Sequence, residues 1–376
     1  MKKMAKKIIA VVLAAVMMVL AFAACSGNTD GQKEGESKSD LKIGVIHIGD
    51  PKEGAGYSYA HDQGIKKACE ALGIADSQVI RKNNVADNNK EAAESAIDEL
   101  VEEGCKVIFA TSYGYMDAVE NRAAKYPEVY FSHCSGYKSN ETNFNNYFGR
   151  IYEARYLAGI AAGMKTQSNK IGYVAAQNDK NPEVTGGIDA FALGVKSVNP
   201  DAKVYVKVTN TWFDLTVEKD AAVSLLNEGC DVIAQHQDTA QPQIAAQEAG
   251  KWGVGYNSDM AIQAPKAVLT SVIWNWEVYY QKAIESVLNG KWDSSNYFGT
   301  MKEGLVDVTP VTENCADGTK EAIEAAKKKI VEEDFRVFSG EIKDNKGNVQ
   351  VKAGEHLEDD YIAGKINWYV DNVVVK

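Results

Sequence analysis

The sequence lacks the short motifs of common catalytic and metal sites. Its 376 residues contain no Gly-x-Ser-x-Gly nucleophile motif, no His-Glu-x-x-His helix and no phosphate-binding loop ending in Gly-Lys-Ser/Thr. The five histidines are scattered, and no spacing between them matches a metal site. We therefore expect no enzymatic activity, no cofactor and no metal.

Cysteine pairs and positive charge are also scarce. None of the six cysteines forms a Cys-x-x-Cys pair, and five remain when Cys25 is set aside, which argues against a full disulfide framework. Lysine and arginine number 41 against 52 acidic residues, so the formal net charge is −11. A nucleic-acid-binding face needs excess positive charge, and we expect no nucleic-acid partner.

There is one long apolar run, at the N-terminus. Four lysines precede the uninterrupted apolar stretch 8–24, a pattern typical of a secretory signal peptide at residues 1–24. The stretch ends in Phe22-Ala23-Ala24-Cys25, which resembles a bacterial lipobox and predicts a lipidated Cys25. Ordinary cleavage that leaves Cys25 unmodified is the alternative. Residues 25–40 hold almost no apolar side chain and predict a flexible tether, so we expect an extracytoplasmic body anchored to the membrane.

From residue 41 onward, short apolar strands alternate with amphipathic helices. This order predicts an α/β fold with mostly parallel sheets, because parallel strands need helical crossovers. We expect two Rossmann-like lobes joined by a hinge. Lobe 1 is assigned 41–149 plus 267–302, and lobe 2 is assigned 150–266 plus 303–376.

One repeated string supports two similar lobes. The segments 100–108 and 225–233 share Leu at the start, Glu-Gly-Cys in the middle and Val-Ile at the end. Glycine commonly ends a helix, so each segment predicts a helix, a stop and a strand. Chance similarity between two such junctions is the alternative. Both segments occupy the same step of their half, which favours a structural repeat.

Polar and aromatic side chains follow many of the predicted strands. Ligands of open α/β sheets lie beyond the carboxyl ends of the strands, so these residues should line a cleft between the lobes. Rings can stack on a planar ligand, and carboxylates and amides can bind its polar edge, as in a purine or a sugar. The candidates are Asp50, Tyr57, Tyr113, Trp212, Asp238, Asn257, Asp259 and Trp274.

Four strings carry a resemblance to a known family, at 56–64, 155–164, 170–174 and 255–259. The body resembles the basic membrane lipoprotein family, the purine nucleoside receptors of bacterial ABC importers. The resemblance implies a periplasmic binding protein type I fold, a small-molecule ligand, and permease and ATPase subunits as partners. It also implies a monomer that closes about its hinge.

The resemblance assigns roles position by position. Tyr57 stands where the family has the phenylalanine that stacks on the base, and Ser58 stands where it has asparagine. Trp212 corresponds to the stacking ring of the second lobe, and the ribose-binding aspartate falls within 257–259. Two positions depart from the family, because Gly54 replaces an aspartate and Trp274 replaces a lysine. These departures make a purine base as good an expectation as a nucleoside.

Two other functions stay open. The protein could be a sensor that binds another planar or sugar-like ligand. It could also cleave nucleosides, although such an enzyme would be expected to carry several aspartates after the first strand, where this chain has Asp50 alone.

Overall fold

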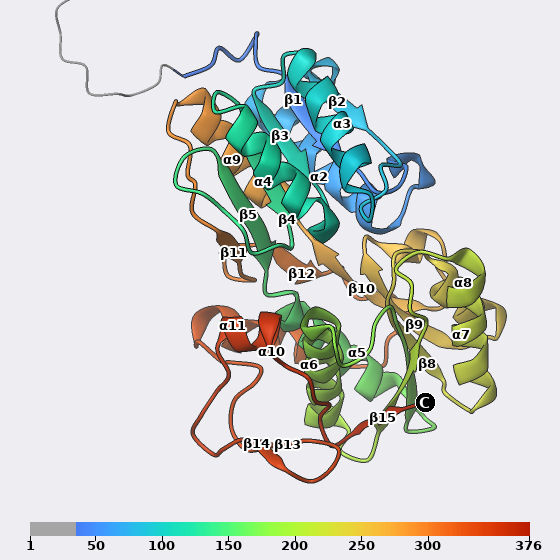
Figure 1. Cartoon of the computed structure of the whole chain (residues 1–376). Coiled ribbons are helices and arrows are strands. Elements are labelled where there is room, and N and C mark those ends of the chain that lie inside the picture. The colour runs from blue at the N-terminus through green and yellow to red at the C-terminus, as the bar shows by residue number, and fades with distance from the viewer. Residues whose placement is uncertain (1–34) are drawn as a thin grey trace, which may run out of the picture.

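The computed structural model describes residues 35–376. The expected signal peptide, the lipidated Cys25 and most of the tether lie outside these residues. The described chain forms two α/β lobes, one above the other in Figure 1, each built on its own sheet. Among residues 35–376, no helix has the length and apolar character needed to cross a bilayer.

The first lobe is built on a six-stranded parallel sheet. Two helices of this lobe pack together on each side, α2 with α9 and α3 with α4. The strand order is β11 (Tyr297–Gly299), β5 (Phe144–Gly149), β4 (Tyr130–Cys134), β3 (Val107–Ala110), β1 (Ile43–Ile46) and β2 (Val79–Lys82). The helices are α2 (Gly56–Leu72), α3 (Lys90–Glu102), α4 (Met116–Lys125) and α9 (Glu277–Leu288).

The second lobe is built on a seven-stranded sheet, parallel except for the pairing of its edge strand β12 with β10. Helix α5 packs on α6, and α7 packs on α8. The strand order is β12 (Val306–Val308), β10 (Val268–Trp274), β9 (Trp252–Asn257), β8 (Val232–His236), β6 (Lys170–Ala175), β7 (Lys203–Val208) and β15 (Val373–Val375). The helices are α5 (Ile151–Lys165), α6 (Pro182–Val198), α7 (Leu215–Asn227), α8 (Gln241–Glu248), α10 (Thr319–Glu332) and the short α11 (Asp359–Gly364).

Smaller elements complete the chain. A turn at 344–347 joins the antiparallel strands β13 (Ile342–Lys343) and β14 (Val349–Val351) into a hairpin. Four short 3-10 helices follow strands or precede them: η1 (Pro51–Glu53), η2 (Asp76–Gln78), η3 (Tyr113–Tyr115) and η4 (Met260–Ile262). The five cysteines of the described chain are free thiols.

The repeated string has the same structure in both lobes. Gly104 and Gly229 both adopt a left-handed φ, 87° and 91°, directly after α3 and α7. In each lobe the carbonyl of the residue before the glycine accepts a hydrogen bond from a lysine at the start of the lobe's first strand, β1 or β6. Lys42 Nζ donates to the carbonyl of Glu103 at 2.8 Å, and Lys170 Nζ donates to the carbonyl of Glu228 at 3.3 Å. The expected repeat is therefore confirmed at the level of individual contacts.

The lobe boundary differs from the expectation at one strand. Val268–Trp274 was assigned to lobe 1, but it forms β10 of the second sheet, where it pairs in parallel with β9. The rest of that piece does reach the first lobe, as α9 and β11. An apolar strand is compatible with either sheet, because its own sequence does not specify the strand with which it pairs. The pairing is decided by contacts distant in the chain.

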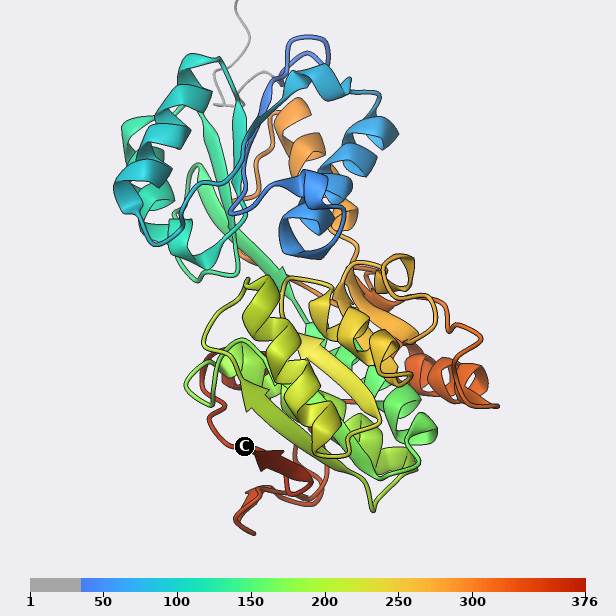
Figure 2. The same cartoon turned by 90° about the vertical axis from the view of Figure 1, so that its right-hand side faces the viewer.

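The chain crosses between the lobes three times, at 149–151, 274–277 and 299–306 (Figure 2). These segments are tied to one another by backbone hydrogen bonds. Arg150 N donates to the carbonyl of Gly299 at 2.8 Å, and Asn275 N donates to that of Leu305 at 2.7 Å. We refer to these three bonded crossings as the hinge, because segments of this kind absorb the rotation in two-lobed binding proteins.

Candidate functional site

The two lobes touch at the start of helix α2. This helix belongs to the first lobe, and it meets the carboxyl ends of strands of the second lobe. Gly56 N, at the start of α2, donates to Ser258 Oγ at 3.3 Å, and Gln263 Nε2 donates to the carbonyl of Gly54 at 3.2 Å. The approach is close enough that a Cβ added to Gly56 would overlap the carbonyl oxygen of Asp238. Glycine at this position thus permits the contact between the lobes.

Two buried polar side chains lie beside this contact. Asn257 ends β9 and Asp238 follows β8, and Asn257 Nδ2 donates to Asp238 Oδ1 at 2.9 Å. The amide oxygen of Asn257 is buried and has no hydrogen-bond partner among the described residues. A buried acceptor without a donor costs free energy, so this oxygen is available to a ligand.

Burial also controls the charge of Asp238. Its pKa is raised well above the ordinary value, first by burial and then by the nearby carboxylates Glu218 and Glu183, while the bond from Asn257 opposes the rise. A carboxyl group in such surroundings is stabilised when it is protonated or when a donor binds it.

The first lobe presents Tyr57 and Ser58 from the first turn of α2. The Tyr57 ring is half-buried and meets the His61 ring edge-on, with 4.4 Å between ring centres. Burial, then the neighbouring Cys134 thiol, raises the pKa of its hydroxyl well above the ordinary range. Ser58 Oγ accepts a 3.0 Å hydrogen bond from Gly49 N, so it fixes α2 to the loop after β1.

The second lobe presents Trp212, after β7. Its ring is half-buried and lies edge-on to His236, with 5.7 Å between ring centres. The Trp212 carbonyl accepts a 3.0 Å hydrogen bond from Asp238 N. This backbone bond holds the segment that carries Trp212 next to the segment that carries the buried Asp238 carboxyl group. Tyr57 and Trp212 come from opposite lobes, and both pack against the same hydrophobic cluster.

Three other candidates have their contacts elsewhere. Tyr113 is 53% exposed, on η3. Asp259 is exposed, and its carboxylate caps η4 by accepting from Ala261 N at 3.0 Å. Asp50 is partly exposed and caps η1 through Lys52 N at 3.0 Å. The structure therefore brings Asp238 and Asn257 together, while Asp259 and Asp50 have local capping roles.

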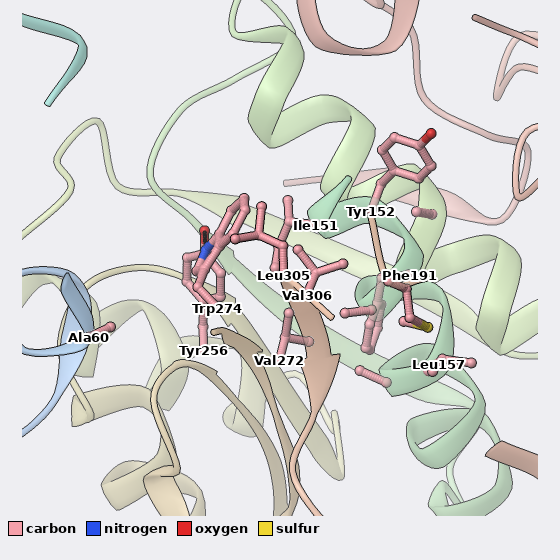
Figure 3. Packing of buried hydrophobic residues seen from close by; sticks show 14 of the residues in the cluster. Ala60, Ile151, Tyr152, Leu157, Phe191, Tyr256, Val272, Trp274, Leu305 and Val306 are labelled. Carbon is pink, nitrogen blue, oxygen red and sulfur yellow. Dashed lines mark hydrogen bonds between the residues drawn. The ribbon is translucent and has the colours of Figure 1, made fainter. Parts of the chain in front are cut away.

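Trp274 lies at the hinge. It is 5% exposed and stacks on Trp276, with ring centres 4.3 Å apart and planes 9° apart. Its indole nitrogen is directed at the Tyr256 hydroxyl at 3.4 Å, as Figure 3 shows. A lysine would be costly to bury in this aromatic stack, which accounts for tryptophan here.

Sequence reasoning missed two charged residues near the site. Arg155, on α5, is 1% exposed, lies 3.9 Å from the centre of the Tyr256 ring and donates to the carbonyl of Gln235 at 2.6 Å. Glu183, on the first turn of α6, lies 3.6 Å from His236 Nε2. An arginine inside an apolar helix was a usable signal. Glu183 follows Asn-Pro, a pattern that predicts only an ordinary helix start, so nothing in the sequence selected it as a site residue.

Metal ligation has no support in the described part of the chain. No three His, Cys, Asp or Glu side chains among residues 35–376 are grouped so that they could hold an ion. The chemistry offered between the lobes is hydrogen bonding and stacking.

Comparison with known proteins gives the family. The family described as ABC transporter substrate-binding protein, PnrA-like, matches residues 41–338. The chain belongs to this family. The match covers both lobes, so the resemblance carried by the four sequence strings is confirmed, and the function class is that of a substrate-binding protein of ABC transporters.

Individual relatives agree. A purine-binding protein of Brucella abortus is 39% identical over 337 residues, which is 90% of this chain and 94% of that protein. A Haloferax volcanii protein, provisionally named an ABC transporter glucose-binding protein, is 36% identical over 310 residues, 82% of this chain and 76% of that one. A solved ABC transporter solute-binding protein of Aeropyrum pernix superposes with a TM-score of 0.66 at 18% identity, covering 84% and 94% of the two chains. This last likeness confirms the periplasmic binding protein type I fold.

Proposed function

We propose that the protein is the lipid-anchored receptor of an ABC importer and that it captures a purine base or nucleoside between its lobes. The ligand would enter between α2 of the first lobe and the ends of β7, β8 and β9 of the second. Tyr57 and Trp212 would hold its ring, and Asp238 and Asn257 would bind its polar edge.

The observation that carries the proposal is the buried pair Asp238 and Asn257. The Asp238 carboxyl group is desolvated, and the Asn257 amide oxygen has no hydrogen-bond partner among the described residues. The pair can therefore accept hydrogen bonds from a ligand that the protein itself does not donate. A purine provides N–H donors and a flat face together. The Brucella relative, named for purine binding, supports the same ligand class.

Ligand identity can be tested directly. Native mass spectrometry of the protein as purified, followed by calorimetry with adenine, guanosine, adenosine, hypoxanthine and D-glucose, should show binding of at least one purine. Binding of glucose alone would overturn the purine proposal. Chromatography of the nucleosides after incubation should show no turnover beyond one equivalent, whereas sustained cleavage would favour an enzyme.

A sugar is the second candidate, favoured by the glucose-binding name of the Haloferax relative. Carboxylate and amide groups also bind hydroxyls. The half-buried indole of Trp212 would serve a sugar or a purine, so the glucose arm of the calorimetry separates the two.

Anchoring is proposed from Cys25 and the preceding apolar segment. Cells grown with a labelled fatty acid should incorporate label into the protein, and Cys25→Ser should remove it. Label retained in the variant would contradict lipidation at this cysteine.

A further inference from the structure

Glu183 is a carboxylate that the site does not yet use. It sits at the start of α6, where Pro182 begins the helix and Asn181 caps it through Val184 N. Among residues 35–376, no side chain or backbone group donates a hydrogen bond to it. Its carboxylate lies 3.6 Å from His236 Nε2. Burial and the Arg155 charge lower the pKa of His236, so the imidazole is neutral near pH 7 and supplies no counter-charge.

The charge of Glu183 acts on groups of both lobes. Burial is the main cause of the raised pKa of Tyr57 and Cys134 in the first lobe, and the charge of Glu183 adds to it. The same holds for Asp238 and Tyr256 in the second lobe, where burial comes first and Glu183 adds to the rise in pKa. About 25% of its side chain remains exposed, yet burial raises its pKa to about 7, with Arg155 opposing the rise. The carboxylate therefore faces a space that admits solvent while being walled by protein.

Buried donors and acceptors around Glu183 are left unpaired. Within residues 35–376, Arg155 Nε and Nη2 have no hydrogen-bond partner, although Arg155 is only 1% exposed. Both ring nitrogens of the fully buried His236 and the amide oxygen of Asn257 are also unpaired. Five unsatisfied polar atoms on three neighbouring side chains are unusual for a folded protein and indicate a place prepared for a polar ligand.

We propose that Glu183 is a specificity-determining residue of the inter-lobe site and that it accepts a hydrogen bond from an amino group on the bound heterocycle. The inference rests on the proposed function and narrows it. Two carboxylates, Glu183 from α6 and Asp238 after β8, and the free oxygen of Asn257 make this region rich in acceptors. The preferred ligand is therefore an uncharged amino-substituted purine, not one that carries oxo groups alone.

Pairs of ligands that differ by one amino group provide the test. Adenine is compared with unsubstituted purine, and guanosine with inosine, by calorimetry on wild-type protein and Glu183→Gln. Wild type should bind the amino member of at least one pair about tenfold or more tightly, the range of a hydrogen bond to a charged group. In Glu183→Gln that preference should fall to within about threefold, through loss of affinity for the amino ligand alone.

A matched control is Glu228→Gln, which removes one negative charge from the surface of the same lobe and should bind like wild type. Glu183→Ala, checked by thermal unfolding, provides a second variant and should lose the same preference. An unchanged amino preference, or an equal loss for both members of a pair, would overturn the inference while purine binding stands. Absence of binding to all four ligands in wild type would overturn the proposed function as well.

Discussion

Gly56, the first residue of α2, lies directly against the carbonyl oxygen of Asp238 in the other lobe, with no room for a Cβ between them. The contact joins the helix that carries Tyr57 to the loop that carries the buried carboxyl. We therefore expect closure of the lobes and assembly of the candidate site to occur together at this point.

Replacement of Gly56 by alanine should keep the lobes apart. The added methyl group meets backbone, which cannot move aside as a flexible side chain can, so we expect a larger radius of gyration in solution and at least tenfold weaker ligand binding. Gly54→Ala is the matched control. Gly54 has a similar left-handed φ, 76° against 82°, so both variants share the backbone cost of about 1 kcal/mol, but nothing lies within 4 Å of its Cβ position. Equal effects in X-ray scattering and calorimetry would contradict a steric role for Gly56.

Replacement of Asp238 by asparagine should separate affinity from stability. The amide oxygen can still accept from Asn257, and a desolvated carboxyl group is removed, so the melting temperature should not fall. The ligand loses a charged acceptor, and binding should weaken by about 1.5–3 kcal/mol. Calorimetry and thermal unfolding on the same preparation test both halves, and wild-type affinity would remove Asp238 from the site.

Replacement of Trp212 by alanine should weaken binding by about 1–3 kcal/mol, the scale for a base stacked on an aromatic side chain. Phe213→Ala is the control, because the adjacent Phe213 ring is 47% exposed. It should bind ligand like wild type. Calorimetry that gives both variants the same affinity would argue that Trp212 does not contact the ligand.

Stability should decrease as the pH rises from about 6.5 to 8.5. Glu218 is fully buried and accepts hydrogen bonds from Thr239 and Asp214, yet burial raises its pKa to about 7. A raised carboxyl pKa gives stability that is complete below the unfolded value of about 4.5 and is lost as the pH rises through 7. Burial also raises the pKa of Glu183 to about 7, so Glu183 should likewise lower the stability as the pH rises.

Buried histidines make the protein less stable as the pH falls, which is the opposite pH dependence, but only below the range of this prediction. Burial lowers the pKa of His47 and His133 to about 4, so their stabilising contribution is lost as the pH falls below about 6.5. Above that pH the carboxyl groups dominate. Glu218→Gln should reduce the loss between pH 6.5 and 8.5 by roughly 1 kcal/mol, measured by denaturant unfolding. A slope identical to that of wild type would show that Glu218 does not titrate in this range.

Local patterns in the sequence determined much of this protein. The alternation of apolar strands and amphipathic helices fixed the α/β class, and the shared Glu-Gly-Cys strings fixed two matching lobes, because helix ends and strand starts depend on neighbouring residues. The rule that ligands lie beyond strand ends also selected Asp238, Asn257 and Trp212. Each of these choices needs only short-range information.

Tertiary structure decided what the local pattern leaves open. Val268–Trp274 joined the second sheet, Trp274 packed into the hinge, and Asp259 became a cap while its neighbour Asn257 met Asp238. Glu183 gained its significance only when α6 placed it beside His236, where its charge also acts on Tyr57 of the other lobe. The physical reason is the same in each case, because strand pairing, burial and electrostatic neighbours are set by residues far away in the chain.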